Sequence, residues 1–186
     1  LELPHDLPRA LFDELIDAHS QDCDATPFPS LARMKDYGAA TAGNLMKLGT
    51  RVLGAGSGAD AAAALAGTAY GLGRQLHEFA HWASHRRLRV PLDLVEALGL
   101  RDEDVYSGAV DAERLRPVFD AIKREIGAQL AALNASRLPN SAAPVLAIAS
   151  CARHAGRDGF NPLDPAAVSP AARIFRCTVA NLLWRF

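Results

Sequence analysis

Apolar residues recur with the spacing of an α-helix along almost the whole chain. The clearest case runs from Leu31 to Val52, where Ser30 can cap the first turn and apolar side chains follow at every third or fourth position. No segment shows the apolar and polar alternation of a strand. The pattern therefore predicts an all-α fold. We expect helices at about 8–22, 30–52, 59–86, 91–99, 112–136, 141–154 and 169–186, with an acidic loop at 101–108.

Small residues interrupt the two helices expected at 30–52 and 59–86. They include Gly43, Gly67, Gly71 and Gly73. Glycine inside a helix costs about 1 kcal/mol relative to alanine, so something must compensate for it. Close packing of the two helices is one explanation, and room for a long ligand between them is the other. The sequence leaves both open.

Composition limits the classes of protein to which the chain can belong. Its 186 residues, 49% of them hydrophobic, suit a single domain over 1–186. A net charge of −1 gives no basic excess for nucleic acid. The three cysteines lie far apart and form no metal-binding spacing. No run of about 18 apolar residues indicates a membrane span.

Two stretches carry a family resemblance. Residues 67–91 begin with Gly67-Thr-Ala69 and end with Arg87 and Pro91, and they resemble the aspartate-rich helix of the squalene/phytoene synthase family. Upstream, YGAATAGNLM resembles the Tyr-x-x-x-Val-Ala-Gly segment of that family. The resemblance implies a single-domain helical bundle of the prenyl (terpenoid) synthase type. It places degenerate substrate-site positions at Tyr37, Gly43, Glu78, Trp82 and Arg87.

The chain departs from the family pattern where the chemistry is most demanding. Family enzymes use Asp-x-x-x-Asp on a helix to hold Mg²⁺ against a diphosphate, and Glu78 and Trp82 stand at those positions here. The chain also starts at Leu1 without Met, so we expect an N-terminally truncated bundle whose first aspartate-rich motif lies upstream. These features predict no catalytic residue and no cofactor, with Mg²⁺ required only if the protein is an enzyme.

A row of histidines is the one candidate metal site. His77, His81 and His85 are spaced four apart beside Glu78, and His-x-x-x-His on a helix can chelate zinc. Without a further ligand in the sequence, we favour a solvated or interface-facing stripe and expect no metal. Arg86, Arg87 and Arg89 follow as a basic cluster, which fits either a solvated helix end or an anion site.

The last helix, at about 169–186, is amphipathic. Its apolar face consists of Phe175, Val179, Leu182, Leu183 and Phe186, while Arg173 and Arg176 lie away from that face. Such a helix can lie on a membrane surface, dock on another subunit, or pack on its own bundle.

The ending GFNPLDPAAVSPAARIFRCTVANLLWRF resembles a divergent branch of the family that includes a mitochondrial complex I assembly factor. This resemblance implies a non-catalytic assembly factor or accessory subunit of a respiratory complex, complex I first. Its partners would be protein subunits on the matrix side of the mitochondrial inner membrane, or a cytoplasmic or peripheral membrane site in a bacterium. The alternatives are a transferase that condenses prenyl diphosphates and a lipid-binding module.

Overall fold

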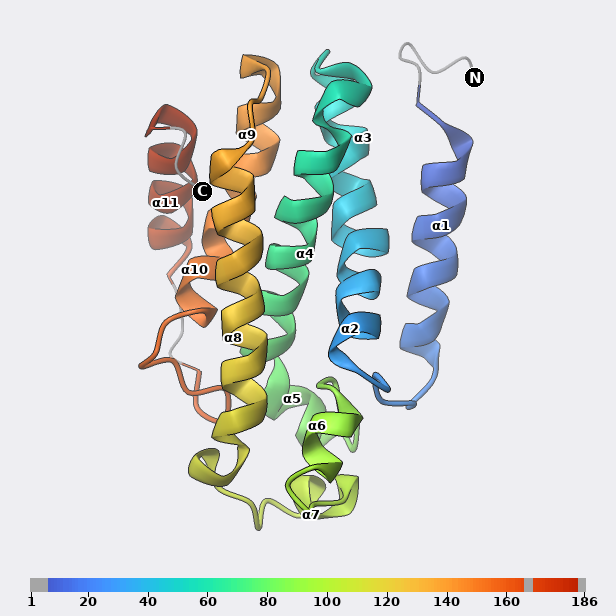
Figure 1. The fold of residues 1–186 in the computed structure, drawn as a ribbon, viewed down its shortest axis with the longest axis vertical. Helices are drawn as coiled ribbons and strands as arrows, with labels where there is room; N and C mark the ends of the chain where they lie inside the picture. Colours follow the sequence, from blue (N-terminus) through green and yellow to red (C-terminus); the bar gives the residue numbers. More distant parts are fainter. Residues whose placement is uncertain (1–6, 166–168, 184–186) are drawn as a thin grey trace.

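The computed structural model describes residues 7–165 and 169–183, and helices joined by short connections make up this part of the chain without a β-strand (Figure 1). The expected all-α fold is confirmed. The helices are α1 Arg9–Ser20, α2 Leu31–Gly38, α3 Asn44–Val52, α4 Asp60–His77, α5 Phe79–Ser84, α6 Leu92–Glu96, α7 Asp102–Tyr106, α8 Ala112–Ala135, α9 Ala143–Leu146, α10 Ala152–Ala155 and α11 Pro170–Leu183. Among the described residues, no helix combines the length and the apolar character that a membrane span requires.

Helix α4 lies at the centre of the bundle. It contacts α2 and α3 on one side and α8 and α10 on the other. Helix α1 packs against α3 and residues 39–43 at one edge, and α11 lies at the opposite edge beside residues 147–151 (Figure 1). The core contains fully buried side chains from α4, α8 and their neighbours, among them Leu72, Leu76, Phe79, Leu115, Ile122, Ile126, Leu133 and Leu146.

The N-cap residues Ser30 and Asp111 correctly predicted where two helices begin. The Ser30 hydroxyl accepts a hydrogen bond from the Arg33 N–H at 3.3 Å, and the Asp111 carboxylate accepts one from the Arg114 N–H at 2.8 Å. Both side chains satisfy a donor that the first helical turn would otherwise leave unpaired. The helices expected to begin after Ser30 and Asp111 are therefore confirmed.

Three sequence predictions about elements were wrong. The helix expected at 59–86 breaks at Glu78, and this turn packs the Phe79 ring edge-on against Phe119 of α8, with ring centroids 5.0 Å apart. The acidic loop forms α7, because its acidic side chains accept from N–H groups of the first turn. Residues 141–154 do not form one α-helix but alternate between short 3-10 and α-helical pieces, and Pro144, a residue without a backbone donor, is the second residue of α9.

The glycines of α4 explain how closely the central helices approach. A Cβ atom added to Gly67 would lie 2.1 Å from the backbone N of Gly43 and 2.2 Å from its Cα. A Cβ at Gly71 would lie 3.0 Å from the Cα of Gly38. Residues 39–43 form a π-helical turn at this crossing, which joins α2 to α3. Close packing against the backbone of Gly43, and not room for a ligand, therefore accounts for Gly67.

This crossing generates a stability prediction. Gly67→Ala should lower the free energy of unfolding by about 3 kcal/mol or more, because its methyl group must push two backbones apart. Gly127→Ala is the matched control, since nothing lies within 4 Å of the added Cβ in the middle of α8. We expect that control to raise the free energy of unfolding by up to about 1 kcal/mol. Urea unfolding measures both, and equal effects of the two changes would contradict the close crossing.

Candidate functional site

Asp22 is hydrogen-bonded to its neighbour His19 and to two distant parts of the chain. The Tyr37 hydroxyl donates to both carboxylate oxygens, at 2.9 and 2.8 Å, and Arg89 Nη2 donates to Oδ1 at 2.7 Å. His19 Nδ1 lies 2.8 Å from Oδ2, and Arg87 Nη1 donates to the backbone carbonyl of Asp22 at 2.6 Å. These contacts join the segment after α1 to α2 and to the extended stretch after α5.

Arg89 is the buried cation of this network. Only 6% of the residue is exposed, and its guanidinium lies 4.9 Å from the ring centroid of Phe28 and 5.1 Å from that of Tyr37. Its Nε donates to Gln75 Oε1 at 3.3 Å. A buried charge is costly unless it is paired and hydrogen-bonded, and Asp22 supplies the opposite charge.

The same contacts change how Asp22 and Tyr37 titrate. Burial opposes ionisation of Asp22, but hydrogen bonds from His19 and Tyr37 and the charge of Arg89 outweigh it, so its pKa is lowered. Burial and the neighbouring Asp22 carboxylate raise the pKa of Tyr37 to about 12. At neutral pH the pair is therefore a carboxylate that accepts from a phenol.

Glu78 stands at the turn between α4 and α5, and both of its oxygens are engaged. Oε1 accepts from Arg74 Nε at 2.9 Å, and Oε2 accepts from the indole Nε1 of Trp82 at 3.1 Å. Trp82 thus binds the carboxylate that stands four residues before it. The positive charge of Arg74 balances Glu78 without a metal ion.

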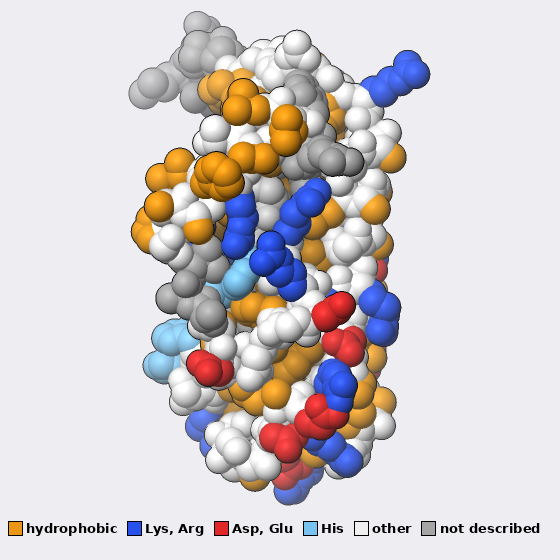
Figure 2. All heavy atoms as spheres, turned by 90° about the vertical axis from the view of Figure 1, so that its left-hand side faces the viewer, with side chains coloured by type: hydrophobic (Ala, Val, Ile, Leu, Met, Phe, Trp, Pro, Cys, Tyr) orange, Lys and Arg blue, Asp and Glu red, His pale blue; other side chains and the backbone are white. Residues whose placement is uncertain are grey.

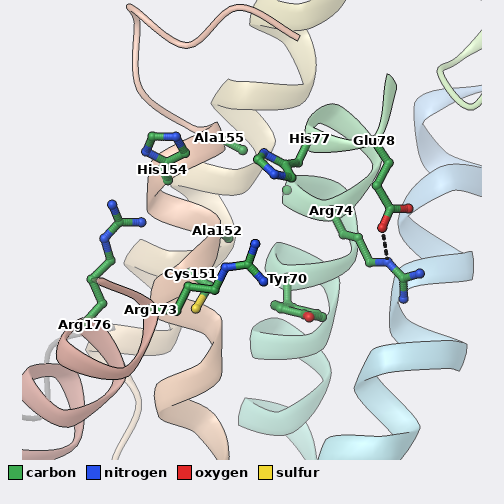
Figure 3. Close-up of a pocket in the computed structure, with 11 residues that line it drawn as sticks. Tyr70, Arg74, His77, Glu78, Cys151, Ala152, His154, Ala155, Arg173 and Arg176 are labelled. Carbon is green, nitrogen blue, oxygen red and sulfur yellow. Dashed lines mark hydrogen bonds and ion pairs between the residues drawn. The ribbon is translucent and has the colours of Figure 1, made fainter. Parts of the chain in front are cut away.

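A cavity of about 340 Å³, which Glu78 helps to line, lies between α4, α10 and α11 (Figure 3). Its lining is rich in cationic and histidine side chains, and Glu78 is the one carboxylate that the described residues contribute to it. Figure 2 shows arginine side chains gathered in the middle of this face, with hydrophobic side chains next to them. The lining residues are Tyr70, Gly73, Arg74, His77, Glu78, Cys151, Ala152, His154, Ala155, Arg173 and Arg176.

Two cysteines connect α11 to the turn that precedes α10. Cys151 Sγ and Cys177 Sγ lie 3.7 Å apart, and both thiols are free. Burial first, and then the neighbouring Cys177, raise the pKa of Cys151 to about 11. Cys151 therefore stays a neutral thiol at physiological pH and adds no negative charge to the cavity wall.

The histidines do not form the single row that their spacing suggests. The helix break at Glu78 separates them: His77 stacks on Phe160 at 5.9 Å and lies 6.5 Å from His154, whereas His81 lies 4.5 Å from His85. Within 7–165 and 169–183, no three His, Cys, Asp or Glu side chains are grouped so that they could hold a metal ion.

The five substrate-site positions expected from the family resemblance do not form one site in the structure. Tyr37 and Arg87 contact Asp22. Glu78 lines the cavity and accepts a hydrogen bond from Trp82, and Gly43 lies in the helix crossing. The basic cluster at 86–89 is not one surface patch, since Arg86 pairs with Glu103 and Arg89 is buried.

Helix α11 exposes most of its apolar face. Phe175, Leu182 and Leu183 are 69%, 71% and 62% exposed, and Val179 is half-buried. Packing of this whole face on the bundle, one of the expected arrangements, is therefore wrong. Cys177 and the buried Ala180 provide the inward contact instead. Phe186 lies outside the described residues.

Sequence analysis did not predict the contact between Asp22 and Arg89 or the position of His154 in the cavity wall. Asp22 and Arg89 are 67 residues apart, so no local spacing connects them. The one available signal was that Arg89 stands between two apolar residues, Leu88 and Val90, both of which are buried. His154 lines the cavity because residues 152–155 pack against α4, and the sequence alone does not determine this packing.

Comparison with known proteins agrees with the helical architecture. The model of the squalene/phytoene synthase family matches residues 3–158. Among solved structures, squalene synthase HpnC from Alicyclobacillus acidocaldarius has a similar fold, with a TM-score of 0.63 at 15% sequence identity. That match covers 96% of this chain and 61% of the other, so the chain spans about three fifths of that protein. The expected fold of the prenyl synthase type is thereby confirmed. No curated protein sequence matches the chain.

The Asp22 cluster predicts an unusual alkaline titration. We expect Tyr37 to ionise near pH 12 instead of its ordinary 10.0, because burial and the Asp22 carboxylate both disfavour the phenolate. The stability contributed by protonated Tyr37 is complete below pH 10.0 and is lost as the pH rises through 12. The difference in tyrosinate absorbance between wild type and Tyr37→Phe isolates this group, and Asp22→Asn should lower its pKa. A difference curve centred on the ordinary value would contradict the assignment.

Proposed function

Because this chain belongs to the squalene/phytoene synthase family, we propose that it uses the family's helical scaffold for binding and does not condense prenyl diphosphates. The observation that carries the proposal is the state of Glu78. Arg74 and Trp82 occupy its two oxygens, so the surviving carboxylate of the expected aspartate pair is already neutralised.

The chemistry of the family explains why this observation matters. Ionising a prenyl diphosphate leaves several negative charges on the leaving group, which Mg²⁺ must neutralise as the bond breaks. Mg²⁺ binds oxygen ligands in a nearly octahedral arrangement and needs carboxylates to hold it. At the corresponding positions this chain has one paired carboxylate and an indole. A nearby guanidinium would also repel a divalent cation.

Assays with farnesyl diphosphate test this proposal. We expect purified protein, with any residues that precede Leu1 in the cell, to release no diphosphate in the presence of Mg²⁺. Mg²⁺ should also leave the Tm unchanged, since a ligand raises the Tm only when it binds the folded state more tightly. Mg²⁺-dependent release that Glu78→Gln diminishes would instead establish the rival function, a prenyl diphosphate transferase.

The binding role that we propose is that of an assembly factor or accessory subunit of a respiratory complex. The setting is the matrix side of the mitochondrial inner membrane, with complex I as the first candidate, as the resemblance of residues 159–186 implies. Support comes from α11, where Ile174, Phe175, Leu182 and Leu183 are each more than 60% exposed. Four large apolar side chains on one exposed helix suit a contact with another protein subunit.

Sedimentation of detergent-solubilised membranes tests this role. We expect the wild-type chain to migrate with a large respiratory complex, and the double variant Phe175→Asp/Leu182→Asp to migrate as a small species. Ile16→Asp/Leu45→Asp is the matched control, because these side chains on α1 and α3 are 66% and 61% exposed at the opposite side of the bundle. An unchanged Tm in both variants shows that the fold is intact. Migration of the wild-type chain as a small species would count against the proposal.

A further inference from the structure

The cavity between α4, α10 and α11 has more positive than negative charge in its wall. Three arginines line it, and Glu78 is the only carboxylate in its wall within residues 7–165 and 169–183. Glu78 pairs with Arg74 at 2.9 Å. The remaining two arginines, Arg173 and Arg176, therefore give the cavity a net positive charge before the histidines are counted.

Neither of these two arginines forms an ion pair within the part of the chain that the structure describes. Other arginines that approach the interior have carboxylate partners, as Arg51 has in Asp60 at 2.6 Å and Arg89 has in Asp22 at 2.7 Å. Figure 3 shows the Arg173 side chain reaching from α11 toward α4, while Arg176 extends toward His154. Two unneutralised guanidinium groups thus border one small space.

His154 adds to the same cavity wall an imidazole ring without a hydrogen-bond partner among the described residues. Both of its ring nitrogens are buried, and neither has a hydrogen-bond partner. A neutral imidazole carries one N–H donor, and a buried donor without an acceptor is unfavourable. An acceptor from outside the chain would satisfy it. His77 stands beside this ring, with centroids 6.5 Å apart.

We propose that this cavity binds a phosphate group directly, without a divalent cation, through Arg173, Arg176 and His154. A guanidinium presents parallel N–H donors that match two phosphate oxygens, which makes arginine the usual residue for this purpose. The volume of about 340 Å³ lies at the lower end of the range of about 300–1,000 Å³ for small-molecule sites. The site therefore suits a phosphate ester or diphosphate more than a bulky ligand.

Two sources can supply the same chemistry. The phosphate can belong to a free anion or to the headgroup of an anionic lipid whose tails lie against the neighbouring apolar side chains of α11. Ile174 and Phe175 are 67% and 69% exposed and lie between Arg173 and Arg176 in the sequence. Both sources would require the arginines, and only the lipid would require a vesicle.

The first experiment titrates inorganic phosphate and pyrophosphate into the full chain by calorimetry, in EDTA and at low ionic strength. We expect saturable binding that Arg173→Gln/Arg176→Gln weakens at least about tenfold, because it removes two charged donors. Arg9→Gln/Arg33→Gln is the matched control, since it removes the same charge from exposed positions on α1 and α2. The single variant Arg173→Gln, at an exposed position, serves if the double variant does not fold.

The second experiment measures co-sedimentation with vesicles of phosphatidylcholine, with and without phosphatidic acid. Binding only to vesicles that contain phosphatidic acid, lost in the double variant and kept in the control, assigns the site to a lipid headgroup. Binding of the free anions with the same dependence assigns it to a soluble phosphate. No saturable binding in either experiment, or an equal loss in both double variants, overturns the proposal.

This inference rests on the proposed function in one respect, namely that an anion is held without Mg²⁺. The two can fail separately. Diphosphate release from farnesyl diphosphate would overturn the binding function while leaving metal-free anion binding to be measured. Binding that requires Mg²⁺ and that Glu78→Gln abolishes would overturn the arginine site itself.

Discussion

The contact between the backbones at Gly43 and Gly67 is the constraint on which the rest of the bundle depends. With a Cβ only 2.1 Å from the opposite backbone nitrogen, no other residue fits at Gly67 without separating the helices. The π-helical turn at 39–43 lies at the same crossing. Dispersion attraction weakens steeply with separation, so this close approach favours many contacts along α2, α3 and α4. These contacts offset the unfavourable helix propensity of the glycines.

The central position of α4 divides the chemistry of the molecule into two regions. Toward α2, Gln75 meets the buried Arg89, whose charge Asp22 balances. Toward α10 and α11, the same helix contributes Arg74 and His77 to the cavity. The first region is internally satisfied, since each charge has a partner inside the fold. The second has cationic groups without such partners, and for this reason we regard it as the binding region.

The sequence predicted what short-range interactions determine. Helical spacing and the caps at Ser30 and Asp111 depend on residues at most four apart, and both were confirmed. The break at Glu78 could not be predicted in this way, because the Phe79 ring packs against Phe119, forty residues further along the chain. The acidic residues in the first turn of α7 are a local signal for a helix start, so this helix could have been predicted in place of a loop. The cavity exists only because α11 packs beside residues 147–151, so its lining could not be read from any one segment.

The sign of the charge near Glu78 connects the family resemblance to the function that we propose. A site that collects Mg²⁺ needs an excess of carboxylates, because the metal must be held before it can neutralise a diphosphate. Here Trp82 removes one potential carboxylate, Arg74 neutralises the other, and α11 adds two further cations to the wall. In the function that we propose, the electrostatic preference is reversed, from a wall that would attract metal ions to one that would attract an anion directly. Under this proposal the chain would give up metal-assisted ionisation but keep recognition of an anion, and the helical scaffold would need no change.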